Sequence, residues 1–118
     1  MTRGMARFML EYLEQTEQSF IMEKARIYNE VIFELVVQTE SILIGGIASL
    51  EKGKGNASVA LDWIVSLARK HEVTLTGRAL RLGKQGLTFN QLKTWYYRHG
   101  FTVKPDGHIT LDKNRATT

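Results

Sequence analysis

The sequence predicts an α+β domain, in which helices and strands share one core around a single sheet. Three observations lead to this class. Apolar residues near the N-terminus recur at helical spacing, and the pattern then changes to β-branched runs that are typical of strands. A glycine-rich turn separates the second of these runs from another helical pattern. The 118 residues, 43% hydrophobic and 24% charged, match one soluble domain, 1–118, with one core.

The N-terminal segment predicts a helix over roughly residues 3–16, because its apolar side chains share one helical face. Those residues are Met5, Phe8, Met9, Tyr12 and Leu13. A second helix is expected over 17–28, on weaker spacing. The residues that could share its face are Phe20, Ile21, Ala25 and Tyr28.

Two strands are predicted next, over 31–37 and 42–50, joined by the polar turn 38–41. The first is β-branched and aromatic throughout. The second carries the pair Gly45-Gly46 in its middle. Glycines inside a strand indicate a β-bulge or the close approach of another group.

The glycine-rich turn 52–57 leads into a helix that we expect to run from Ala57 to about His71, followed by a strand over 73–76. Its inward stripe is apolar. The stripe consists of Ala57, Ala60, Leu61, Ile64, Leu67 and Ala68.

The last part of the chain predicts a capped helix and a hairpin. Thr88 and Gln91 form a capping-box pattern, and Gly100 should end the helix that they begin. Pro105-Asp106-Gly107 is a turn sequence, because Pro fixes φ and Gly adopts positive φ. We therefore expect a hairpin with strands at 101–103 and 108–111, and a loose tail over 113–118.

Composition excludes several kinds of function. The sequence has no cysteine, so disulfides, thiolate metal sites and cysteine nucleophiles are absent. Its three histidines lie far apart and lack metal-ligand spacing, and we predict no metal site. No apolar run approaches about 18 residues, and the N-terminus lacks an apolar signal core, so we expect a cytoplasmic protein.

The net charge of +4 is spread along the chain, without a dense basic block or interleaved aromatic residues. A basic balance fits nucleic acid, anionic lipid or a phosphorylated ligand, and charge alone does not choose among them.

The glycine turn between a strand and a helix suits a diphosphate. The first amides of a helix have no intrahelical partner, and the helix dipole adds partial positive charge there. Lys52 and Lys54 would add further charge. The competing interpretation is a tight turn with a lysine-rich rim.

A second notable segment, 95–101, lies about 40 residues further along the chain. It reads Trp-Tyr-Tyr-Arg-His-Gly-Phe at the end of the last helix. An aromatic face that packs into the core, with Gly100 as the C-cap, is the simpler interpretation, and for Trp95 it is the preferred one. We expect Tyr97 at the surface and His99 packed near the helix end.

Taken together, the two segments resemble the GNAT superfamily of acyl-CoA-dependent N-acyltransferases. Its phosphate loop reads Arg/Gln-x-x-Gly-x-Gly/Ala, and residues 52–58 take that place, with Lys52 instead of Arg or Gln. Its later signature is an aromatic-Tyr pair, three residues, then Gly-Phe, which matches 95–101. The resemblance covers about 42–112 and is strongest to short phage-type members, which include an anti-CRISPR acetyltransferase.

The resemblance implies a mixed, mostly antiparallel sheet with flanking helices. It also implies a V-shaped cleft between two neighbouring parallel strands, near Ile47 and Val73, that receives acetyl-CoA. The residues expected to contact acetyl-CoA are Ile47, Ala48, Ser49, Leu50, Lys52, Gly53, Lys54, Gly55, Asn56, Ala57 and Ser58.

In such a protein the acceptor amine attacks the thioester directly. A backbone amide near Ile47 would stabilise the oxyanion, and Tyr96 would protonate the leaving thiolate. The general base is not evident: Glu34 is the first candidate and Glu51 and Glu40 are alternatives, although each also fits a solvated carboxylate.

Residues 1–28 match no part of the family pattern, so the sequence does not identify the acceptor. The resemblance limits it to a protein lysine, a host-protein lysine included, or a small amine. A second hypothesis keeps the fold but makes it a binding module that inhibits or modulates a partner protein. A third, nucleic-acid binding, rests on net charge alone. Self-association is left open.

Overall fold

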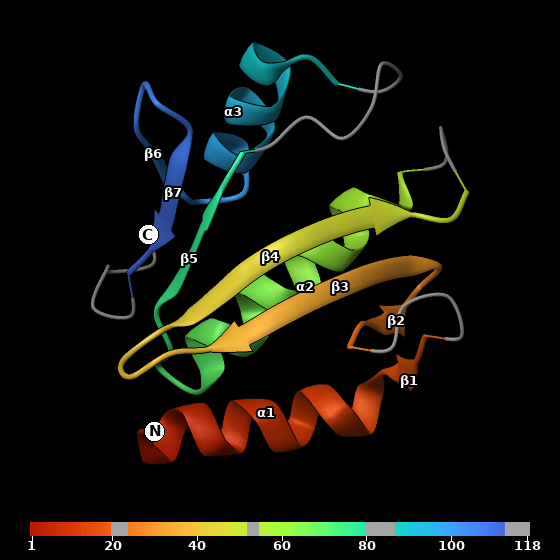
Figure 1. Ribbon diagram of the computed structural model, residues 1–118, viewed down its shortest axis with the longest axis vertical. Coiled ribbons are helices and arrows are strands. Elements are labelled where there is room, and N and C mark those ends of the chain that lie inside the picture. The colour runs from red at the N-terminus through yellow and green to blue at the C-terminus, as the bar shows by residue number, and fades with distance from the viewer. Residues whose placement is uncertain (20–23, 52–54, 80–86, 113–118) are drawn as a thin grey trace.

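The computed structural model describes residues 1–19, 24–51, 55–79 and 87–112. Three helices and seven strands are described in these ranges (Figure 1). They are α1 (Arg3–Gln15), β1 (Glu17–Gln18), β2 (Arg26–Tyr28), β3 (Val31–Val37), β4 (Ile42–Ser49), α2 (Asn56–Lys70), β5 (Leu75–Arg78), α3 (Phe89–Arg98), β6 (Thr102–Val103) and β7 (His108–Leu111).

The strands form one sheet in the order β1-β2-β3-β4-β5-β7-β6. Only β4 and β5 are parallel among the pairs of described strands, and the other neighbours are antiparallel. The α+β class and the mixed, mostly antiparallel sheet are therefore confirmed.

The helix predicted over 17–28 is wrong, because its described parts form β1 and β2. Asn29 and Glu30 adopt positive φ, 51° and 62°, and make a two-residue turn that folds β2 back onto β3. Strand pairing satisfies the backbone there, so tertiary context overrides a weak helical spacing. Residues 20–23, which carried part of that prediction, lie outside the described ranges.

The remaining elements match their predictions closely. The strand expected at 73–76 begins two residues later, because Val73 still donates its amide to the Ala68 carbonyl at the end of α2. The capping box is present: Thr88 Oγ1 accepts from the Gln91 amide at 3.2 Å, and the Thr88 amide donates to Gln91 Oε1 at 2.8 Å.

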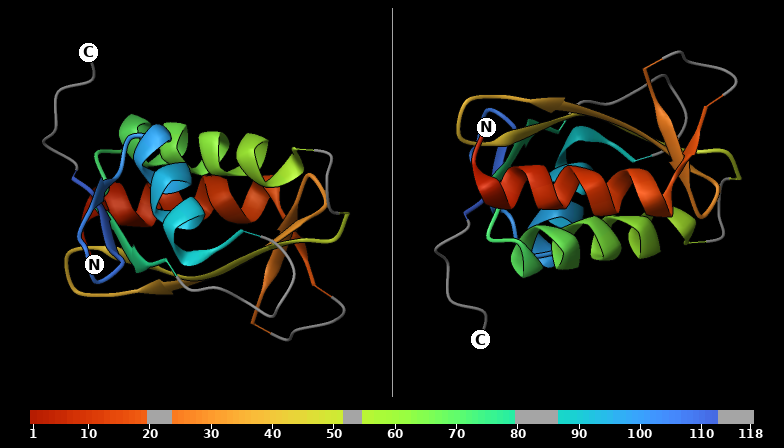
Figure 2. Two further views of the ribbon diagram at one scale, coloured as in Figure 1. Left: turned by 90° about the horizontal axis from the view of Figure 1, so that it is seen from above. Right: turned by 90° about the horizontal axis from the view of Figure 1, so that it is seen from below.

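All three helices pack on the same face of the sheet (Figure 2). Side chains from α1, α2 and α3 join alternate residues of β3, β4, β5 and β7 in one core. Its largest fully buried members include Phe8, Phe33, Phe101, Met5, Ile42, Leu61, Ile64, Leu75 and Ile109.

The helix α1 runs antiparallel to α2 and lies close to it. Glu11 contacts Lys70 Nζ at 2.7 Å, and Trp63 Nε1 donates to the Gln15 side chain at 2.7 Å. At the other end of α1, a Cβ on Gly4 would collide with the carbonyl oxygen of His71. Glycine is therefore required where α1 crosses the end of α2.

None of the helices in the described ranges is both long enough and apolar enough to cross a bilayer.

Candidate functional site

The parallel strands β4 and β5 pair over only part of their length. Ile42 to Ile44 lie opposite Leu75 to Gly77, and no pair is found beyond them in the described part of either strand. The strand β4 continues to Ser49, and its ribbon moves away from β5 beyond this point (Figure 1). The outer half of β4 thus has a strand neighbour on the β3 side alone among the described residues.

A β-bulge coincides with the end of this pairing. Opposite β4, Glu34 pairs with Gly46 whereas Leu35 pairs with Ile44, so Gly45 is the extra residue. The predicted bulge is therefore confirmed. Because the bulge absorbs one residue, Ile47 lies opposite the buried Phe33 and belongs to the helix-facing side of the sheet.

The bulge also decides which peptide groups face the unpaired edge of β4. The Leu50 amide donates to the Glu30 carbonyl at 2.8 Å, on the β3 side. Peptide groups alternate in direction along a strand, so those of Ala48 point the same way and those of Ile47 and Ser49 point away from β3. The amide predicted as an oxyanion donor, near Ile47, is thus directed toward the side that β5 has left.

Glu34 lies beside the bulge. Its neighbour Phe33 is buried in the core, so the Glu34 side chain extends from the opposite face of the sheet. A Cβ placed on Gly45 would be 3.6 Å from both Cγ and Cδ of Glu34, which puts the carboxylate over the bulge. Of the alternative bases, Glu40 lies in the β3–β4 turn at the far end of β4, and Glu51 is exposed just after β4 ends.

The first turn of α2 follows β4 after a short loop. Its N-cap is Gly55, in the left-handed conformation with φ 72°, and no side chain of the described residues caps the helix. A Cβ on Gly55 would meet no atom of the described residues within 4 Å. The amides of Asn56, Ala57 and Ser58 are the unpaired donors that any helix start presents. Lys52, Gly53 and Lys54 lie outside the described residues.

Tyr96 is held by the end of α3. The Phe101 amide donates to the Tyr96 carbonyl and the Gly100 amide to the Tyr97 carbonyl, at 3.2 and 3.1 Å, with Gly100 at φ 99°. This is a Schellman motif, and the Tyr96 and Phe101 rings pack edge to face across it, 5.5 Å apart. The Tyr-x-x-x-Gly-Phe pattern therefore has a structural role as a helix stop.

The Tyr96 side chain is 6% exposed, and burial raises the pKa of its phenol to about 12. Within the described residues its hydroxyl has no hydrogen-bond partner, yet no side-chain oxygen there is both fully buried and unpaired. The Tyr96 hydroxyl oxygen must therefore be accessible to solvent at the edge of the core. Tyr97 is 68% exposed, as predicted.

Two polar contacts, which sequence reasoning missed, fasten α3 to the start of α2. Trp95 Nε1 donates to Ser58 Oγ at 2.8 Å, and His99 Nδ1 lies 2.6 Å from Asp62 Oδ1. His99 is thus packed near the helix end, as predicted, and Trp95 is half-buried against the core. The sequence held a signal for these two contacts. Trp95 and His99 are four residues apart on one helix, and Ser58 and Asp62 are four residues apart on the other.

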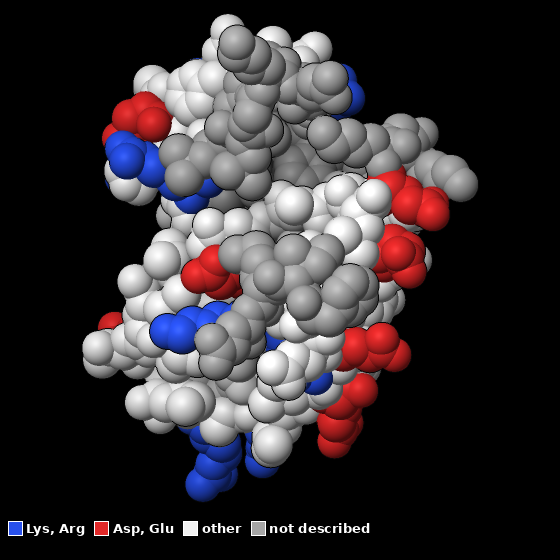
Figure 3. All heavy atoms as spheres, turned by 45° about the vertical axis from the view of Figure 1, so that its right-hand side comes forward, with Lys and Arg blue, Asp and Glu red and all other residues white. Residues whose placement is uncertain are grey.

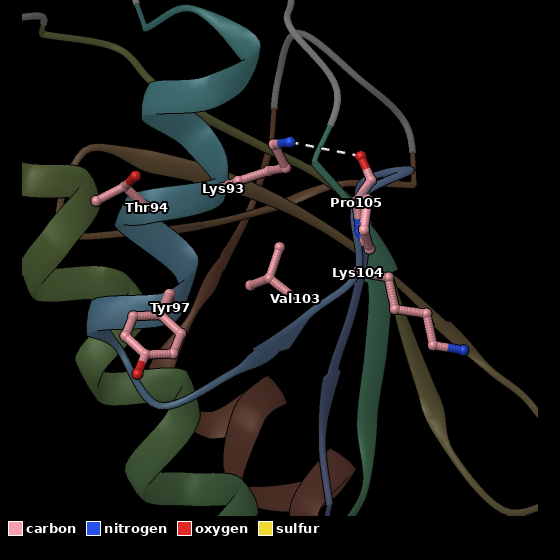
Figure 4. Close-up of a pocket in the computed structure, with 6 residues that line it drawn as sticks. All are labelled: Lys93, Thr94, Tyr97, Val103, Lys104 and Pro105. Carbon is pink, nitrogen blue, oxygen red and sulfur yellow. Dashed lines mark hydrogen bonds between the residues drawn. The ribbon is translucent and has the colours of Figure 1, made fainter.

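Two surface cavities lie on either side of α3. One, of about 410 Å³, is lined by Leu87, Asn90, Gln91, Thr94, Trp95 and Arg98. Trp95, one of its lining residues, also bonds to Ser58 in the first turn of α2. The other, of about 370 Å³, lies between α3 and β6 (Figure 4), where Lys93 Nζ reaches the Pro105 carbonyl at 3.4 Å and Lys104 points away. Neither is lined by Tyr96 or Glu34.

Comparison with known proteins relates the chain to a solved structure by fold. No protein-family model matches the sequence, and no curated protein matches it. A crystal structure described as the anti-CRISPR protein AcrVA5 superposes with a TM-score of 0.61 at 14% identity, covering 73% of this chain and 94% of that one. At this identity the likeness establishes a shared α+β fold and nothing of activity.

Proposed function

We propose that the chain binds acetyl-CoA between β4 and β5 and transfers the acetyl group to an amine. The observation that carries the proposal is the early end of β4–β5 pairing at a bulge, followed along the chain by the uncapped start of α2. An unpaired strand edge can bind an extended amide-containing arm through its peptide groups. A helix start can bind the diphosphate that follows such an arm.

The roles follow from position. The Ile47 amide would donate to the carbonyl oxygen as the amine nitrogen attacks the carbonyl carbon, and the C–S bond would then break. Tyr96 would give its phenolic proton to the departing thiolate. Its raised pKa keeps it protonated at neutral pH, although it also makes the phenol a weaker acid. Glu34, on the opposite face of the sheet, would accept the proton from the amine.

The cavity beside Trp95 and Arg98 supports the same proposal, because Trp95, which lines it, bonds to Ser58 in the first turn of α2. It offers an indole face, amide side chains and one guanidinium to the nucleotide end of the substrate. The acceptor is proposed to be an amine of a protein lysine or of a small molecule.

A second candidate is a binding module that inhibits another protein by occupancy. The fold likeness to a structure described as an anti-CRISPR protein favours it. The two candidates differ in one measurable property, acetyl transfer, and both are compatible with the fold.

Calorimetry and thermal unfolding with acetyl-CoA test the proposal. Binding should raise the melting temperature by several degrees at millimolar acetyl-CoA, through mass action. Gly55→Asp and Gly55→Asn form a matched pair, since both residues tolerate the left-handed conformation and differ mainly in charge. Asp should weaken binding about tenfold or more relative to Asn, because its carboxylate would repel the diphosphate.

Absence of any thermal shift in the parent protein would refute acetyl-CoA binding. Binding without transfer to a panel of lysine peptides, polyamines and bacterial proteins would favour the inhibitor.

A further inference from the structure

The outward face of α1 is exposed and combines apolar and charged residues. Leu10 is 64% exposed and Leu13 44% exposed. Arg3, Arg7 and Glu14 are exposed beside them, at spacings of four and seven residues that place them on one side of the helix. Viewed from below, α1 is the element nearest the viewer (Figure 2).

Within the described residues, the charges on this face have no partner. The inward carboxylate of α1, Glu11, contacts both Lys70 and His71, at 2.7 and 3.0 Å. By contrast, no hydrogen bond or ion pair is found there for the side chains of Arg3, Arg7 or Glu14. In Figure 3, where α1 again forms the lower edge, Lys and Arg atoms project at the bottom and Asp and Glu atoms lie at the lower right.

The order of these charges is unfavourable for α1 by itself. The first turn of α1 has no acidic residue and its last turn has no basic one. Arg3 and Arg7 lie toward the positive end of the helix dipole, and Glu14 lies toward its negative end. The positive charge at the C-terminal end of α1 comes from another element: Arg26 of β2 donates to the Leu13 and Thr16 carbonyls. The reversed charges on the outer face therefore do not serve this helix.

The same order is complementary to a second copy of itself. If two α1 helices pack antiparallel about a two-fold axis next to Leu10, Arg7 of each copy lies opposite Glu14 of the other. Residues 7 and 14 are equally distant from a point between residues 10 and 11, so both ion pairs form together. The two Leu10 side chains meet at the axis, and the helix dipoles oppose each other.

We propose that the outer face of α1 is a self-association surface and that its partner is a second copy of this chain. A pair of 13-residue helices buries less area than the standard interface of roughly 1,600 Å². The dimer should therefore be weak and reversible, with a dissociation constant on the order of 10⁻⁵ M. This inference does not depend on the proposed acetyl transfer.

Sedimentation velocity from about 1 µM to 1 mM tests the proposal. The parent chain should shift from monomer to dimer across this range, and more salt should weaken the dimer, because exposed ion pairs are screened. Arg7→Glu and Glu14→Arg should each weaken dimerisation about tenfold or more, since each places like charges opposite each other across the axis. The double variant should restore it.

Loss of folding does not confuse this test, because Arg7 and Glu14 are exposed and each single change should alter the melting temperature of the monomer only slightly. Leu10→Ser should weaken the dimer as the charge changes do. Arg98→Glu, an exposed change on α3, should leave it unaffected. A parent that stays monomeric at 1 mM, or single variants whose effects persist in the double variant, would overturn the proposal.

Discussion

Tyr96 carries two roles that its sequence motif does not separate. Its backbone and ring take part in the Schellman motif that ends α3, and its hydroxyl is the proposed acid. The end of α3 was predictable from the sequence, because a helix that stops in this way needs a glycine such as Gly100 whether or not Tyr96 takes part in catalysis. The burial of Tyr96, and with it the raised pKa, comes from packing against Phe101 and Trp95 and could not be derived from the motif.

Tyr96→Phe separates the two roles, because it keeps the ring and removes the hydroxyl. Within the described residues that hydroxyl makes no hydrogen bond, so the free energy of unfolding should change by less than about 1 kcal/mol. Acetyl transfer in single-turnover assays should fall by about 10²-fold or more. Tyr97→Phe, at an exposed position, is the control and should be nearly silent. Equal transfer rates for Tyr96→Phe and the parent would exclude Tyr96 as the acid.

At the scale of elements, the close contact between α1 and α2 depends on a single glycine. Gly4→Ala raises intrinsic helix propensity by up to about 1 kcal/mol. It nevertheless places a methyl group on the His71 carbonyl, which belongs to backbone and cannot rotate away. We expect a net loss of about 1–2 kcal/mol of stability, by analogy with other overpacked sites.

Denaturant unfolding measures this loss. Gly46→Ala is the matched control, since its added methyl meets no atom of the described residues within 4 Å and should change stability by less than about 0.5 kcal/mol. A Gly4→Ala variant as stable as the parent would show that α1 can shift away from α2 without cost.

Most elements were predictable because their signals are local. The capping box, the helix-ending Gly100 and the Pro-Asp-Gly hairpin each need only neighbouring residues. The wrong helix over 17–28 shows the limit: the turn at Asn29-Glu30 uses a glutamate at positive φ, which sequence preferences do not favour, and pairing of β2 with β3 stabilises it. Of the candidate site, the bulge was predictable, whereas the polar ties between α2 and α3 depend on how the helices meet.

At the scale of the whole molecule, we expect the ionisation of two buried tyrosines to lower the free energy of unfolding at high pH. Burial raises the pKa of both Tyr12 and Tyr96, although Arg26 partly opposes this at Tyr12. The folded pKa values exceed the unfolded value near 10, so this contribution is fully present below pH 10 and is lost as the pH rises toward 12 and above. Each tyrosine contributes a slope of at most about 1.4 kcal/mol per pH unit.

Urea unfolding at pH 9, 10 and 11 measures the slope. Tyr12→Phe should flatten it by removing one titrating group, and Tyr97→Phe, at an exposed position, should leave it unchanged. A stability that does not vary between pH 10 and 11 would show that the phenols ionise as easily in the folded chain as in the unfolded one.

The bulge at Gly45 has a consequence for the ancestry of folds like this one. A single inserted residue reverses which peptide groups of the outer half of β4 face the side that β5 leaves, while the core residues on either side keep their places. Chains whose sequences have diverged beyond recognition could therefore be sorted by one yes-or-no character, the presence of that insertion. Common descent can be traced in such a character after side-chain identity has faded, because losing the insertion would turn every later side chain of the strand to the wrong face.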